Sequence, residues 1–129
     1  MSKPLAVLDT ECYKNYWLCK FRRLDTGAVR AFEMYPGQPL DIIGLRSTLQ
    51  RVTSITFNGN NYDKPMIGLA LSGASCELLK RASDFIILGN SRPWDVERQF
   101  NFKTPDFDHI DLIEVVPGMV SLKVYMGRL

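Results

Sequence analysis

The sequence predicts an α/β fold with a mixed five-stranded sheet flanked by helices. Three short strand-like segments come first and are joined by turn residues, which indicates an antiparallel meander. Segments with helical periodicity then alternate with two further short strands, which is typical of parallel crossover units. Right-handed crossovers would place the first, fourth and fifth strands side by side. The expected strand order is therefore 3-2-1-4-5, with the hairpin on one edge.

Composition is that of one ordinary globular domain, which we expect to span residues 1–129. The 129 residues are 46% hydrophobic and 23% charged, and the formal net charge is +2. With so small a net charge, any face for nucleic acid must come from local arrangement. Three cysteines without a C-x-x-C pair favour a reducing compartment over a zinc site. The start does not resemble a secretory signal and no apolar run is long enough to span a membrane, so we expect a cytoplasmic protein.

The first half of the chain carries the meander, one helix and the fourth strand. An apolar strand is expected at Leu5–Leu8, where the run stops at Asp9. A hairpin is expected over residues 13–35, with its turn at residues 24–27. Residues 40–51 show helical spacing of apolar side chains, and residues 52–57 form the β-branched fourth strand.

The second half is expected to contain two helical segments and the fifth strand. Asp63 stands where a helix N-cap is expected, and helices are predicted over 63–71 and 75–88. Residues 89–106 are polar and aromatic with two prolines, which predicts a long irregular connection. Residues 108–112 form the fifth strand. Pro117-Gly118 predicts a turn, and residues 120–129 the beginning of a helix.

Two acidic sites follow strands that should be neighbours. Asp9 and Glu11 are two apart at the carboxyl end of the first strand, so they should project to the same side. Two like charges this close repel unless a cation lies between them, and hard oxygen ligands suit Mg²⁺ or Mn²⁺. Asp63 follows the fourth strand and should lie near Asp9. Taken singly, Asp63 is compatible with a plain N-cap and the other two with a solvated strand end; together they favour a metal site.

These motifs resemble those of a known enzyme family. Asp9-Thr10-Glu11 resembles the first motif, D-x-E, of the DnaQ-like (DEDD) 3′–5′ exonucleases, and residues 58–63, Asn-Gly-Asn-Asn-Tyr-Asp, resemble the second. Residues 108–112, followed by Ser121-Leu122-Lys123, resemble exonuclease domains of phage replication proteins and phage-type DNA polymerases. The resemblance implies an RNase H-like fold that hydrolyses phosphodiesters with four acids and two divalent metals.

The resemblance also implies roles for single residues. Asp9 would bridge both Mg²⁺ or Mn²⁺ ions, Glu11 would share in holding them, and Asp63 would hold the second, directly or through water. Three further residues are expected at or near the substrate. Asn58 would touch the terminal nucleotide, Thr10 would lie beside the substrate, and Tyr62 would pack behind Asp63.

One part of the family pattern is missing. The third motif places a fourth acid on a late helix, and no such acid follows Tyr125 in this sequence. We therefore expect a C-terminally incomplete domain with an incomplete two-metal site, weak or inactive alone, or one completed by a helix from another polypeptide. Asp111 is expected beside the site, supporting it more readily than binding metal. His109 is expected to have a packing or surface role rather than to act as a base.

Basic and aromatic residues supply candidate nucleic-acid contacts. Lys14 and Lys64 follow the two acidic motifs closely, so they are the expected phosphate contacts. Trp17 and Phe21 are expected to pack within the sheet. Trp94, in the predicted connection, is compatible with a cap over the cleft or with an anchor for a protein partner.

The sequence-based hypothesis is a metal-dependent exonuclease acting on single-stranded DNA, or on RNA, in phage-type replication or proofreading. In a phage-encoded protein the compartment would be the host cytoplasm, with a polymerase or other replication protein as partner. One alternative is a catalytically incomplete binding module that docks on nucleic acid or on a replication or host protein. Another is an RNase H-like endonuclease. A half-core left exposed by a missing helix would favour a homo-oligomer.

Overall fold

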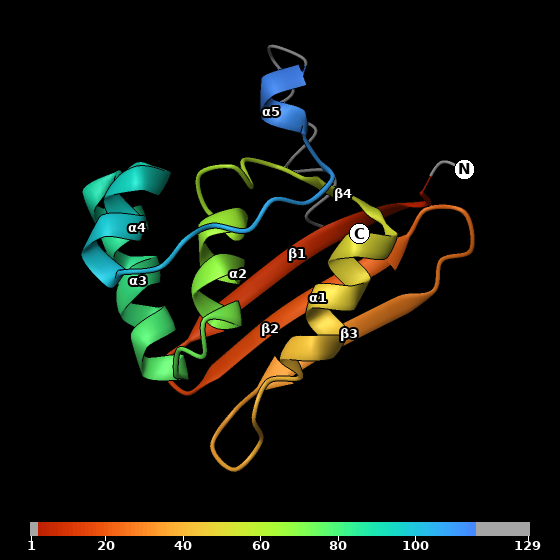
Figure 1. Ribbon diagram of the computed structural model, residues 1–129. Coiled ribbons are helices and arrows are strands. Elements are labelled where there is room, and N and C mark those ends of the chain that lie inside the picture. Colours follow the sequence, from red (N-terminus) through yellow and green to blue (C-terminus); the bar gives the residue numbers. More distant parts are fainter. Residues whose placement is uncertain (1–2, 116–129) are drawn as a thin grey trace.

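A computed structural model describes residues 3–115 of the chain. Its helices and strands follow one another along the chain as shown in Figure 1. In order they are β1 (Leu5–Tyr13), β2 (Tyr16–Arg23), β3 (Val29–Met34), α1 (Ile42–Arg51), β4 (Thr53–Thr56), α2 (Asp63–Leu71), α3 (Cys76–Gly89), α4 (Pro93–Phe100), β5 (His109–Asp111) and α5 (Leu112–Val115). The expected turn at Pro117-Gly118, the expected helix over residues 120–129 and the motif at 121–123 lie outside the described residues.

The five strands form one mixed sheet in the order β3-β2-β1-β4-β5, which confirms the predicted α/β class, the mixed five-stranded sheet and its strand order. β1 pairs antiparallel with β2 and parallel with β4, and β4 pairs parallel with β5. The hairpin therefore occupies one edge, and the crossover strands occupy the other. The central position of β1 brings its polar end beside the loop that follows β4.

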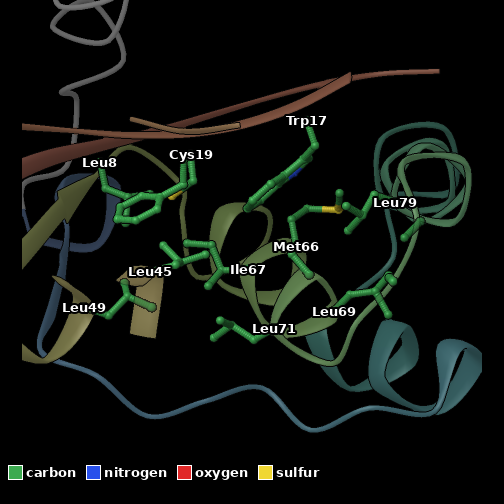
Figure 2. Close-up of a cluster of buried hydrophobic side chains, with 14 of the residues drawn as sticks. Leu8, Trp17, Cys19, Leu45, Leu49, Met66, Ile67, Leu69, Leu71 and Leu79 are labelled. Carbon is green, nitrogen blue, oxygen red and sulfur yellow. The ribbon is translucent and has the colours of Figure 1, made fainter. Parts of the chain in front are cut away.

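The hydrophobic core lies between the sheet and the helices. Trp17, Cys19 and Phe21 alternate along β2 and are at most 3% exposed, which confirms the packing role expected for Trp17 and Phe21. Figure 2 shows Leu8, Trp17 and Cys19 of the sheet facing side chains of α1 and α2. Those helical side chains include Leu45, Leu49, Met66 and Ile67. α2 is buried along almost its whole length, so it is the central helix of this layer.

The first strand is longer than its apolar run predicts. β1 was expected to end at Leu8, but it continues to Tyr13. The reason is the hairpin: β2 pairs with β1 from Ala6–Arg23 to Tyr13–Tyr16, and this ladder holds polar residues in an extended conformation. Asp9 and Glu11 therefore lie within the strand and not beyond its end.

About half of the segment predicted as an irregular connection is helical. α3 continues to Gly89, and α4 occupies Pro93–Phe100. Pro93 takes the first helical position, and the Asp95 carboxylate accepts the Arg92 backbone N–H at 3.3 Å. Proline followed by an acidic residue two positions later is a helix-start signal that could have identified α4 from the sequence.

The start of α2 also differs from expectation. Tyr62, not Asp63, occupies the N-cap position, and Asp63 is the first helical residue. An acidic side chain in the first turn of a helix interacts favourably with the helix dipole.

No helix in residues 3–115 combines the length and apolar character that crossing a membrane requires.

Candidate functional site

A cleft of about 1090 Å³ lies where β1 extends past its parallel neighbour. β4 pairs with β1 only at Leu5, Ala6 and Val7, and β4 ends at Thr56. The chain then leaves the sheet, so β1 beyond Val7 borders a hollow that is also lined by the loop after β4 and by the end of α3. Six of the predicted site residues line this cleft: Asp9, Thr10, Glu11, Asn58, Tyr62 and Asp63.

The alternation of β1 sends its polar residues to opposite faces of the sheet. Ala6 and Leu8 are buried against the helices, so Thr10, at the same parity, faces the helix layer. Asp9 and Glu11 have the other parity and are exposed. These two carboxylates share one face, as the sequence predicts.

Asp63 approaches the strand from the helix side. The Thr10 hydroxyl donates a hydrogen bond to Asp63 Oδ1 at 2.5 Å, and the Asp63 side chain is 9% exposed. Asp63 thus meets the inward face of β1, while Asp9 and Glu11 occupy its outward face. Within residues 3–115, no three histidine, cysteine, aspartate or glutamate side chains form a group that could hold a metal ion.

The loop after β4 is held by a buried carboxylate from β5. Asp111 is 4% exposed, and its two oxygens accept the backbone N–H groups of Asn58 at 2.7 Å and Asn60 at 3.1 Å. Asp111 also accepts the Ile113 N–H at 3.2 Å. Hydrogen bonds to a carboxylate are stronger than those between neutral groups. Asp111 therefore supports the loop that carries Asn58.

A second set of contacts sets the loop's path. The Gly59 N–H donates to Thr56 Oγ1 at 3.1 Å, and a Cβ at position 59 would lie only 2.1 Å from that oxygen. Asn58 has φ +64°, a left-handed conformation that asparagine tolerates better than most residues. His109 Nε2 lies 2.5 Å from Thr56 Oγ1, and its ring packs 5.7 Å from that of Phe107. His109 therefore lies between Thr56 and Phe107, and its role stays a prediction.

Tyr62 links the site to α3. Its hydroxyl lies 2.7 Å from Ser83 Oγ, and burial raises the pKa of the phenol. Tyr62 follows the loop directly and precedes Asp63, so this bond anchors the first turn of α2 against α3. The position agrees with a packing role for Tyr62 behind Asp63.

The basic side chains that line the cleft are not the two favoured from the sequence. Lys14 lies in the turn between β1 and β2, and the Lys64 ammonium lies 5.4 Å from the centre of the Phe107 ring. Neither lysine lines the cleft, whereas Lys20, Arg22 and Arg92 do. Lys20 is the cross-strand partner of Asp9. The period-two alternation of β2 is the signal that could have placed Lys20 and Arg22 on the face of Asp9.

Two carboxylates of the cleft are of the donor type that a hard cation prefers. Asp9 and Glu11 offer exposed carboxylate oxygens on one face, and such oxygens suit Mg²⁺ or Mn²⁺. Cys12 faces the helices, and burial raises its pKa to about 11. A thiolate, not a thiol, is the ligand that softer metals require.

No family model, curated protein or solved structure matches this chain. Its functional assignment therefore depends on the residues of the cleft and on the sheet that positions them.

Proposed function

We propose that the chain is a divalent-metal-dependent 3′–5′ exonuclease domain with an RNase H-like fold of the DnaQ-like type. Its substrate would be the 3′ end of single-stranded DNA, in phage-type replication or proofreading. One observation supports this most directly. Asp9, Glu11, Asn58 and Asp63, the residues of both family-like motifs, line one cleft at the edge of the central strand. They come from segments about 50 residues apart in the chain.

In this proposal each residue acts from its observed place. Asp9 and Glu11 would hold Mg²⁺ or Mn²⁺ through their carboxylate oxygens, and Asp63 would contribute a further carboxylate, directly or through water. The bound cations would lower the pKa of a water and neutralise charge on the leaving oxygen. Asn58, on a loop fixed by Asp111, contacts the terminal nucleotide. A water oxygen attacks the terminal phosphorus, the bond to the preceding 3′ oxygen breaks, and that oxygen takes a proton as the nucleoside monophosphate leaves.

The test is degradation of a 5′-labelled single-stranded oligonucleotide with Mn²⁺. We expect stepwise shortening by the wild type and none by Asp9→Asn, which removes the charge at nearly constant size. Asp106→Asn is the matched control, because Asp106 is exposed and does not line the cleft. A closed single-stranded circle should remain intact, since it has no 3′ end. Shortening that persists in Asp9→Asn, or cleavage of the circle, would contradict the proposal.

The second candidate is a binding module that docks on nucleic acid without cleaving it. The observation that favours it is that residues 3–115 contain no compact group of three potential ligands. The same experiment separates the two functions. A binding module would retain the oligonucleotide in both wild type and Asp9→Asn, with no shortening in either. Removal of the carboxylate would then leave binding equal or tighter, because one negative charge fewer would face the phosphates.

A further inference from the structure

Trp94 presents a largely exposed indole to the same cleft as the carboxylates. Its side chain is 55% exposed and lines the cleft together with Arg92 and Pro93. Large aromatic side chains are costly to leave in water unless they have a partner. The other tryptophan, Trp17, is fully buried in the core. The two indoles therefore occupy opposite environments, and only Trp94 is available to a ligand.

The backbone under Trp94 is held firmly. Trp94 is the second residue of α4, and Pro93 restricts the first. Val96 is completely buried, and the Phe100 ring packs edge-on against that of Phe85 at 5.7 Å. At the C-terminal side, the Glu97 carboxylate accepts the Thr104 N–H at 2.7 Å. α4 lies beside α3 (Figure 1), so the indole projects from a fixed support and not from a free loop.

Positive charge accompanies the aromatic surface. The Arg92 guanidinium carbon lies 5.2 Å from the centre of the Trp94 ring. Lys20 and Arg22 line the same cleft from β2. An exposed aromatic ring flanked by cations that reach a common groove is the combination with which proteins bind single strands: bases stack on the ring, and cations neutralise phosphates.

We propose that Trp94 is a base-stacking platform for single-stranded nucleic acid in this cleft. A nucleobase stacks on the indole, and Arg92 contacts the adjacent phosphate. Because every base has a π face, this contact holds the strand without reading its sequence. The identity of the ligand as a nucleic acid rests on the proposed function, but stacking requires neither metal nor cleavage.

Intrinsic fluorescence tests this contact directly. The protein carries the Asp9→Asn substitution, and EDTA is present, so that no strand is degraded. A short oligothymidylate should quench the emission of Trp94, while buried Trp17 remains unaffected. With excitation at 295 nm, which selects tryptophan over tyrosine, the quench should disappear in Trp94→Phe, in which Trp17 is the sole tryptophan. Quenching of equal size in Trp94→Phe would overturn the proposal.

Affinity provides the second measurement. Trp94→Ala should weaken binding by about 5-fold to about 100-fold, the range expected for loss of one stacked base. Trp94→Phe should restore most of that affinity, which excludes misfolding as the cause. Tyr35→Ala is the matched control, because Tyr35 is also an exposed aromatic but does not line the cleft. Unchanged affinity in Trp94→Ala would overturn the proposal.

An oligomer without bases completes the test. The protein with Trp94 intact should bind an abasic strand about as weakly as Trp94→Ala binds oligothymidylate. The Trp94→Ala substitution should cause no further loss of affinity for the abasic strand. A Trp94-dependent loss of affinity for the abasic strand would show that the indole does not stack on a base. These outcomes are separate from those of the cleavage assay: the platform is retained if Asp9→Asn still degrades DNA, and the exonuclease is retained if Trp94→Ala binds normally.

Discussion

The loop Asn58–Asn61 and the strand segment Asp9–Glu11 supply polar residues to the same cleft, but they are held in different ways. The loop lacks a regular ladder, and side chains of neighbouring strands secure it: Asp111 accepts two of its N–H groups and Thr56 accepts a third. The strand segment is secured by its backbone, through continuous pairing with β2. Its two carboxylates are exposed.

Because of this difference, a substitution in the strand segment removes a charge without moving the backbone, whereas a substitution around the loop can move the backbone itself. A loop held by buried side chains depends on a few individual groups, so one substitution can displace it. A strand residue in a continuous ladder can lose its side chain while the backbone stays in place. Substitutions at Asp9 and Glu11 should therefore test chemistry with little change in stability, whereas those around the loop should affect both.

The largest effect is expected from Asp111→Ala. It leaves the Asn58 and Asn60 N–H groups without their carboxylate, which should lower the free energy of unfolding by about 3 kcal/mol. Asp106→Ala, at an exposed loop position, should stay within about 0.5 kcal/mol of the wild type. Urea unfolding measures both. Equal stability of the two variants would mean that the loop does not depend on Asp111.

Thr10→Val tests the hydrogen bond between the strand segment and Asp63, the first residue of the helix that follows the loop. Valine keeps the shape of threonine but cannot donate to the Asp63 carboxylate, so we expect a loss of about 1 to 2 kcal/mol in the free energy of unfolding. Thr10→Ser keeps the hydroxyl and should lose less. The urea midpoint at unchanged slope gives the comparison. A Thr10→Val protein as stable as the wild type would mean that this hydrogen bond does not contribute to stability.

The smallest effect concerns Cys12, whose side chain lies on the inward face of β1 next to the outward Glu11. Burial is the main cause that raises its pKa from the ordinary 9.0 to about 11, and Lys80 partly opposes the shift. Because the folded pKa is the higher one, the thiol contributes stability below pH 9 that is lost as pH rises toward about 11. The stability of the wild type relative to Cys12→Ala should therefore fall across that range. Urea unfolding at several pH values would detect it, and a difference independent of pH would contradict the burial of this thiol.

Local patterns were sufficient to predict most of the fold. The meander, the β-branched fourth strand and the handedness of crossovers together predicted the order 3-2-1-4-5. The extent of β1 was underestimated because pairing with β2, not the apolar run, decides where the strand ends. The helix α4 was missed because the two prolines and the polar residues of segment 89–106 suggested a connection, although Pro93 begins a helix.

The sequence predicted which acidic residues line the cleft better than it predicted how the residues of the cleft are arranged. Period-two alternation correctly put Asp9 and Glu11 on one face, and topology brought Asp63 to the same cleft. Sequence proximity to the acidic motifs was a poor guide to the basic residues. Lys14 lies in a turn and Lys64 lies over Phe107, whereas Lys20 and Arg22 reach the cleft from a strand that pairs with β1.

By itself, the sequence determined the strand order and the face that each strand residue occupies, because both follow from short-range periodicity and chain handedness. Only the tertiary structure decided which polar groups meet. That Thr10 binds Asp63, that Asp111 holds the loop of Asn58, and that Trp94 shares a cleft with Asp9 all join segments far apart in the chain. Such contacts depend on how the helix layer packs against the sheet, and no local pattern encodes that packing.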